Sequence, residues 1–210
     1  MEPPSRLSGR RAQAARNDEL ILEAAREVFV ADPEAPISAV ARRAGVGIAA
    51  LYRRYPSKED LLRRLVREGL HQYLQAAEEA VADGGDPWNA FATFLHRVVD
   101  ADTHSMTLRL AGTFAPTEDL PREADRAQHL NVRLFERTQA AGALRPDLVV
   151  DDLSFVLQQV ASVRLADQRR TSELRHRYLA LHLDALRARP GTPLPGPPPS
   201  WEEVSGRWSG

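Results

Sequence analysis

The sequence predicts an all-α protein of about nine helices, three in an amino-terminal head and the remainder in a larger helical body. Three observations lead to this fold class. Apolar residues recur at intervals of three and four along most of the chain, which is the spacing of one face of an α-helix. Glycine and proline clusters divide the chain into segments of about 10 to 20 residues. No segment shows the strict alternation that is typical of a half-buried strand.

Length and composition narrow the possible classes of protein. A chain of 210 residues can form one or two domains with a real core, and the absence of cysteine excludes disulfides and thiolate metal or redox chemistry. No apolar run approaches the roughly 20 residues that span a bilayer, and no signal peptide is visible, so we expect a soluble, cytoplasmic protein. Residues 1–70 carry a charge of +3 and residues 71–210 a charge of −4. This modest asymmetry agrees with an amino-terminal part that faces an anionic partner.

The chain opens with a basic segment. Residues 1–15 combine several arginines with two prolines and a glycine, and we expect a flexible basic arm that is either inert or in contact with an anionic partner. The first helix follows, and its apolar face is formed by Ile21, Ala25, Val28 and Phe29.

Residues 37–62 predict two short helices, a tight turn and the start of a longer helix. The first short helix has an apolar face made of Ile37, Val40, Ala41 and Ala44. Gly45 ends it, because glycine tolerates the left-handed conformation that often closes a helix. In the next helix Leu51 and Tyr55 are expected to point inward. Tyr52 and Arg53 then face outward, as in a helix that enters a DNA major groove.

These residues resemble the TetR family of transcriptional regulators, whose DNA-binding domain is a three-helix helix-turn-helix unit. The resemblance covers residues 16–74 without a gap. The matching residues are Ala41, Ala44-Gly45-Val46, Leu51-Tyr52, Tyr55, Ser57-Lys58-Glu59 and Leu61. The resemblance implies a DNA-binding regulator, most often a repressor in this family, that binds a palindromic double-stranded operator as a homodimer.

The resemblance also implies which positions contact DNA: Ser38, Gly47, Ile48, Ala49, Ala50, Tyr52, Arg53, Arg54 and Lys58. Residues 47–50 depart from the small polar residues that are common there, so Ile48 and Ala50 are expected to contact thymine methyl groups. Arg53 is the candidate for direct base reading, because a guanidinium can bond to both O6 and N7 of guanine. Tyr52, Arg54 and Lys58 are expected to anchor phosphates.

The remainder of the chain predicts a helical body over residues 75–189. Ser57 is expected to cap a long helix that leads into it, and residues 83–87 break that helix. Further breaks fall near residues 115–116, 142 and 145–147. Residues 190–210, which are rich in proline, are expected to form a disordered tail.

Family members dimerise through their last two helices and surround a small-molecule pocket with their middle helices. The implied dimer residues are Leu153, Leu157, Val160, Arg164, Leu174, Tyr178, Leu181 and Ala185. The implied pocket residues are Trp88, Phe91, Phe94, Leu95, His96, Phe114, Phe155 and Gln159. An aromatic stripe at helical spacing is also ordinary core packing. The identity of the effector is open.

An enzyme is the first competing interpretation. Six histidines are present, but none forms a metal-binding pair at i and i+4, and no phosphate loop or nucleophile elbow occurs. We therefore expect no catalysis, no cofactor and no metal site. The second alternative is a helical protein-interaction module that has lost DNA recognition and has no effector, which the apolar residues 47–50 would suit.

Overall fold

The computed structural model describes residues 6–102, 119–189 and 191–205, without the side chains of residues 6–15 and of Ser205. Within these ranges the chain is all-helical, apart from an isolated bridge between Leu144 and Arg187. The nine described helices are α1 (Arg6–Ala31), α2 (Ile37–Ala44), α3 (Ile48–Arg54), α4 (Lys58–Ala82), α5 (Pro87–Asp100), α7 (Leu120–Ala140), α8 (Asp152–Ser162), α9 (Gln168–Leu186) and α10 (Trp201–Ser205). The predicted fold class is confirmed.

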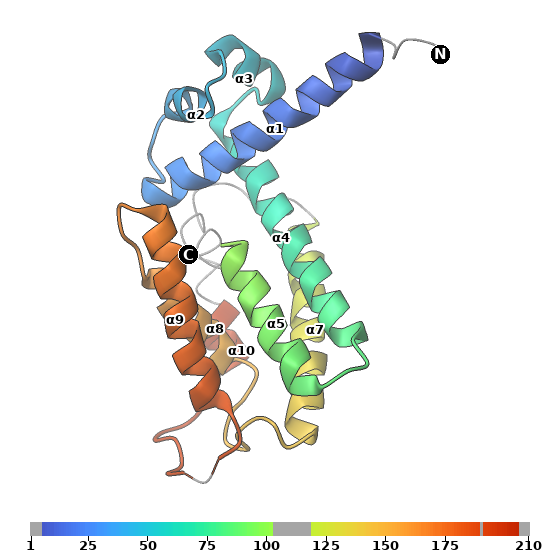
Figure 1. Cartoon of the computed structure of the whole chain (residues 1–210), viewed down its shortest axis with the longest axis vertical. Coiled ribbons are helices and arrows are strands. Elements are labelled where there is room, and N and C mark those ends of the chain that lie inside the picture. Colours follow the sequence, from blue (N-terminus) through green and yellow to red (C-terminus); the bar gives the residue numbers. More distant parts are fainter. Residues whose placement is uncertain (1–5, 103–118, 190, 206–210) are drawn as a thin grey trace.

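Figure 1 shows a head made of α1, α2 and α3 above an elongated body of roughly parallel helices. The head core combines residues from its three helices with residues from the start of α4. Its fully buried side chains include Phe29, Val40, Leu51 and Leu61. Each contributes about 1.5–3 kcal/mol through removal of apolar surface from water, which is how such a small unit keeps a defined shape.

The first helix is longer than the sequence pattern predicts. α1 begins at Arg6, so residues 6–15 are helical and not a flexible arm. Alanine, arginine and glutamine dominate this segment, and these residues favour a helix even where no apolar face is present. Apolar periodicity therefore gives no sign of a helix in this segment. Figure 1 shows this part of α1 reaching beyond the rest of the head.

A single helix, α4, joins the head to the body. Ser57 caps it as expected, since its Oγ accepts a hydrogen bond from the Asp60 N–H at 3.0 Å. Leu61 and Leu65 belong to the head core, whereas Leu74 belongs to the body core. The boundary expected near residue 74 therefore falls inside an unbroken helix, and the two cores share one rigid element.

The body core lies between α4, α5, α7, α8 and α9. Arg137 of α7 secures the end of α4, because its guanidinium donates to the carbonyl oxygens of Ala80, Val81 and Asp83 at 2.8–3.0 Å. Helix α5 begins at Pro87, and the Asp86 side chain caps it. Among the described residues, no helix combines the length and the apolar character needed to cross a membrane.

The tail follows a defined path where disorder was expected. Residues 191–205 return along the body and end in α10, where Val204 is only 4% exposed. Asp147 accepts the Leu194 N–H at 3.0 Å, and Arg145 donates to the Thr192 carbonyl oxygen at 3.0 Å. These bonds satisfy two backbone groups of the tail that would be bonded to water in a disordered segment. Residues 206–210 of the predicted tail lie outside the described residues.

Candidate DNA-binding surface

The turn between α2 and α3 depends on the backbone of Gly45. This residue has φ +67°, and its N–H bonds to the carbonyl oxygen of Arg42, while the Val46 N–H bonds to that of Ala41. A β-carbon at Gly45 would meet no atom within 4 Å. Glycine is therefore favoured here by backbone conformation and not by lack of space. The turn sets the direction in which α3 leaves α2.

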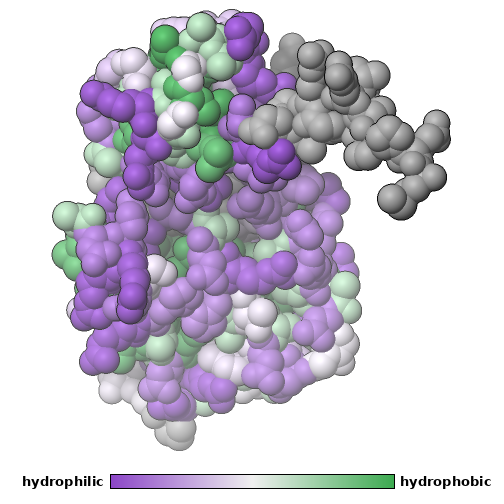
Figure 2. Space-filling model, turned by 45° about the horizontal axis from the view of Figure 1, so that its top comes forward, coloured by the Kyte–Doolittle hydropathy of each residue, from purple (hydrophilic) through white to green (hydrophobic). Residues whose placement is uncertain are grey.

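Helix α3 has one buried side and one exposed side. Leu51 is fully buried and Tyr55, which ends the helix, is 5% exposed. Ile48 and Tyr52 are 42% and 47% exposed. The other expected contact positions lie as follows: Ser38, Gly47, Ala49, Arg53 and Arg54 are exposed and Ala50 is half-buried. Figure 2 shows a hydrophobic area over the head with hydrophilic side chains around it.

Arg54 forms a bidentate ion pair with Asp18 of α1. Its Nε and Nη2 donate to the two carboxylate oxygens at 2.8 and 2.9 Å, and the Tyr55 hydroxyl donates to the same carboxylate at 2.6 Å. The hydrogen bond from Arg54 lowers the pKa of Asp18. Burial and the bond to Asp18 raise the pKa of Tyr55 to about 12. Sequence reasoning missed Asp18, since it lies 36 residues before Arg54.

Lys58 is engaged inside the head. Its ammonium donates to the Pro33 carbonyl oxygen at 2.7 Å and lies 5.3 Å from the centre of the Phe29 ring. The side chain is half-buried. In this arrangement its charge joins the start of α4 to the end of α1 and the turn that follows it, and its role as a phosphate anchor stays a prediction.

The exposed cations of the helix-turn-helix differ in their partners. Arg43 pairs with Glu27 of α1. In the part of the chain that the structure describes, Arg42 and Arg53 are exposed and take part in no ion pair. A guanidinium without an internal partner keeps all its donors for an external anion or a base edge. Arg42, which was not among the expected contacts, thus joins Arg53 as a candidate.

Most of the aromatic residues expected in an effector pocket belong to the core. Phe91 and Leu95 are fully buried, Phe94 is 2% exposed and Trp88 is 9% exposed. Arg187 covers the Trp88 ring at 4.3 Å from its centre. These four residues belong to the body core between α4, α5, α7, α8 and α9. Their burial fits ordinary core packing, and their place in an effector pocket stays a prediction.

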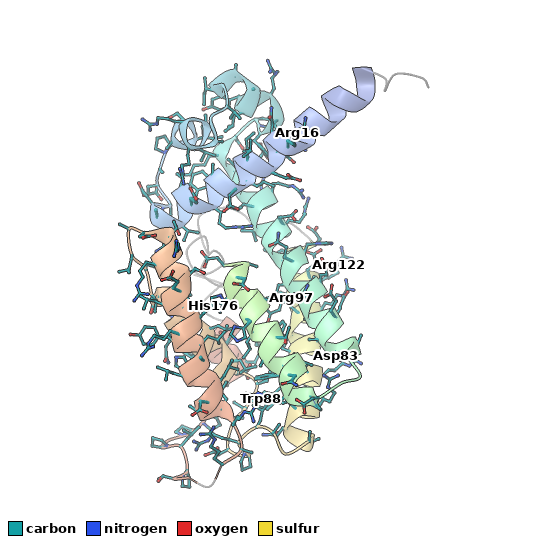
Figure 3. All side chains as sticks on the ribbon, viewed as in Figure 1. Arg16, Asp83, Trp88, Arg97, Arg122 and His176 are labelled. Carbon is teal, nitrogen blue, oxygen red and sulfur yellow. The ribbon has the colours of Figure 1, made fainter. Side chains whose placement is uncertain are left out.

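The remaining pocket candidates are scattered. His176 of α9 is labelled in Figure 3. Its Nδ1 lies 3.1 Å from Nδ1 of His96, and its Nε2 lies 2.7 Å from an Asp100 oxygen. Burial and the neighbouring His176 lower the pKa of His96. Phe155 is half-buried and Gln159 is exposed. Phe114 lies outside the described residues.

A different set of residues forms a small cavity between α5, α8 and α9. Its enclosed volume is only about 10 Å³, and its lining is Val98, Val99, Asp102, Leu157, Val160, Ala161 and Arg175. The Arg175 side chain is 8% exposed and donates to Asp102 at 2.6 Å and to the carbonyl oxygens of Ala161 and Val163 at 3.1 Å. Arg175 lies four residues before Leu179 and eight before Leu183, so its position in the sequence places it on the same face of α9 as these buried leucines.

The residues expected at a dimer interface divide between the core and the surface. Leu153, Leu157 and Val160 of α8 are buried in the core of their own subunit, so their assignment to an interface is revised. Periodicity identifies an apolar stripe but not what covers it. The other expected residues lie as follows: Tyr178 and Leu181 are 42% and 60% exposed, Ala185 is exposed, and Arg164 and Leu174 are half-buried.

The fold and the exposed face of α3 define a helix-turn-helix DNA-binding protein. Comparison with known proteins identifies the family within this class. Residues 21–65 match the model of bacterial regulatory proteins of the tetR family, and residues 86–188 match the C-terminal domain of SbtR-like transcriptional regulators. The chain belongs to the TetR family of transcriptional regulators, as the sequence predicted.

Individual relatives agree with this assignment. The HTH-type transcriptional repressor LfrR of Mycolicibacterium smegmatis is 38% identical over 101 residues, which are 48% of this chain and about half (50%) of that protein. TetR regulators from Mycobacterium vanbaalenii and Streptomyces coelicolor are 26% and 27% identical, each with a TM-score of 0.56. They cover 84% and 82% of this chain, and the matches span 98% and 99% of theirs. LfrR in complex with proflavine has a TM-score of 0.57 at 22% identity, over 79% of this chain and 95% of that one.

Proposed function

We propose that this protein represses transcription by binding, as a homodimer, an operator of two inverted half-sites, and that a small molecule bound in the body releases it. One observation carries the proposal. Helix α3 buries Leu51 and Tyr55 in the head and exposes Ile48, Tyr52 and Arg53 on the opposite side. A helix held in this way can enter the major groove with its outward side chains against base edges.

The exposed side chains divide into base readers and phosphate anchors. Arg53 suits guanine, because its fork of donors matches O6 and N7, and such a pair discriminates by about 1–3 kcal/mol against a wrong base. The methyl groups of Ile48 and Ala50 suit thymine. Tyr52 and the exposed Arg42 suit phosphates, which set position and not sequence.

The homodimer is supported by the exposed face of α9. Tyr178, Leu181 and Ala185 follow one another at intervals of three and four, so they lie on one side of the helix. All three are exposed. A two-fold interface built on this face presents two copies of α3, and the operator is then palindromic with half-sites about 34–36 Å apart or a multiple of that spacing.

Release by an effector is supported by the cavity between α5, α8 and α9. Its apolar walls suit a small apolar compound, and the Arg175–Asp102 pair supplies one polar side. The enclosed space is only about 10 Å³, roughly that of one water molecule. Typical ligand sites measure ~300–1,000 Å³, so the cavity must widen to admit a ligand. The relative LfrR has been solved with proflavine bound. A ligand shifts the spacing of two heads only by its difference in affinity for the two states.

Selection of duplexes from a randomised pool tests the proposal. The purified protein is incubated with the pool at two salt concentrations, and bound duplexes are sequenced. We expect an enriched inverted repeat, and we expect Arg53→Ala to relax the preference at the positions that α3 contacts. Failure to enrich any sequence, with binding that disappears uniformly as salt rises, would contradict sequence reading. That result would favour the protein-interaction module suggested by the apolar residues 47–50.

A further inference from the structure

We propose that Asp18 is a positioning residue that holds the recognition helix α3 in its DNA-reading orientation through Arg54 and Tyr55. This rests on the proposed function of α3 as a sequence reader. It changes the expected role of Arg54 from a phosphate anchor to the link between α3 and α1. It also makes an acidic residue a requirement for binding a polyanion.

Helix α3 needs support from outside itself. It has only seven residues, its N-cap residue Gly47 makes no side-chain capping bond, and no acidic residue lies in its first turn. Helices of this length are unstable alone, because the nucleation cost is not recovered in so few turns. Leu51 and Tyr55 hold one side of α3 by apolar packing. Such packing is non-directional and leaves rotation about the contact unopposed.

The Asp18 carboxylate forms directional bonds that fix the orientation of α3. Both of its oxygens receive Arg54 donors, at 2.8 and 2.9 Å, and one also receives the Tyr55 hydroxyl at 2.6 Å. The Asp18 side chain is 13% exposed, whereas that of Arg54 is 62% exposed. A bidentate pair fixes the plane and the angle of the guanidinium as well as its distance. The carboxyl end of α3 is thereby tied to the long helix α1.

Charge alone predicts the opposite effect on DNA binding. A carboxylate beside the recognition helix repels phosphates, so its removal should strengthen binding if Asp18 acted only through its charge. Glu27 of α1 offers a matched comparison. It pairs with Arg43 of α2, its side chain is 25% exposed, and among the described residues it forms no ion pair with α3. The two acidic residues therefore separate positioning from simple repulsion.

The experiment compares Asp18→Asn with Glu27→Gln on two probes. One probe is the inverted repeat that the wild-type protein enriches, and the other is a scrambled duplex of the same composition. We expect Asp18→Asn to weaken binding of the repeat roughly tenfold, since charge-assisted bonds are lost, and to change binding of the scrambled duplex less than about twofold. Glu27→Gln should bind both probes as tightly as the wild type or slightly more tightly, because it removes a negative charge.

Arg54→Gln distinguishes the two roles of the arginine. If Arg54 acts through Asp18, Arg54→Gln lowers affinity for the repeat to the same extent as Asp18→Asn, and the double variant loses no more than either one. The slope of log affinity against log salt stays as in the wild type. A phosphate anchor would instead reduce that slope by about 1. Tyr55→Phe, which keeps the ring in the core, should weaken binding of the repeat but not of the scrambled duplex.

Several results would overturn the inference. If the Asp18→Asn variant binds the repeat as tightly as the wild type, or more tightly, Asp18 has no positioning role. A reduced salt slope in Arg54→Gln, with Asp18→Asn unaffected, makes Arg54 a phosphate anchor. If Asp18→Asn and Tyr55→Phe each weaken binding of both probes equally, the contact only stabilises the head and does not position α3 for sequence reading. A wild-type protein that enriches no sequence overturns the proposed function, and the positioning role falls with it.

Discussion

Leu51 tests how firmly the recognition helix is held by the head. Its side chain is fully buried, so Leu51→Ala removes about three methylene-sized groups from the core at about 0.8 kcal/mol each. The cavity that remains adds to this loss, and measured Leu→Ala changes reach about 3–5 kcal/mol. We expect the free energy of unfolding to fall by about 3 kcal/mol. Because α4 contributes to both cores, head and body should unfold together, with a thermal midpoint lowered by about 6–12 °C.

Circular dichroism during heating, with urea unfolding at 25 °C, measures this change. The control is Ile48→Ala on the same helix, where the side chain is 42% exposed and the expected change in stability is within about 0.5 kcal/mol. A shift below about 2 °C for Leu51→Ala, or equal shifts for the two variants, would refute the anchoring of α3 by Leu51. Two separate transitions, with only the first affected, would refute the coupling of head and body through α4.

Three further predictions concern the body. Arg175→Met should lower the free energy of unfolding by about 2–4 kcal/mol in urea, because it leaves Asp102 and two carbonyl oxygens without their donor. A neutral result would contradict this. The control is Asp184→Ala at an exposed ion pair, with an expected change of about 0–1 kcal/mol. The pKa of His96 is lowered in the folded protein, so as the pH falls His96 is protonated in the unfolded chain before it is protonated in the folded one. Stability should therefore fall as the pH drops below about 6.5 and level off below the folded pKa. His96→Gln should flatten this profile. Leu181→Asp should convert the proposed dimer to monomers in sedimentation velocity without lowering the thermal midpoint of the monomer, since the side chain is 60% exposed; a dimer that persists would place the interface elsewhere.

Local signals predicted the head well. Gly45 was expected to end α2, and it does so with a left-handed backbone conformation. Ser57 was expected to cap α4, and its Oγ accepts the Asp60 N–H. Leu51 and Tyr55 were expected to point inward, and both are buried. Each of these features depends on residues within a few positions of one another, which is the range over which backbone conformation and capping bonds act.

Partners that lie far apart in the sequence escaped prediction. Arg54 and Lys58 were assigned to phosphates because their positions suited the helix-turn-helix, but their donors go to Asp18 and to the Pro33 carbonyl oxygen. Sequence separations of 36 and 25 residues leave no periodic trace. Only the packing of α1, and of the turn that follows it, against the rest of the head and the start of α4 brings these groups together.

The sequence by itself determined most of the helices, the turn after α2, the family and the outward face of α3, because periodicity, glycine conformation and capping are encoded locally. It did not determine the start of α1 or the helix α10. The tertiary structure alone decided which apolar stripes became core. Leu153, Leu157 and Val160 face the inside of their own subunit, whereas Tyr178 and Leu181 stay exposed. Burial of an apolar face is favourable against any apolar surface, so the pattern shows that a face must be covered, and only packing shows by what.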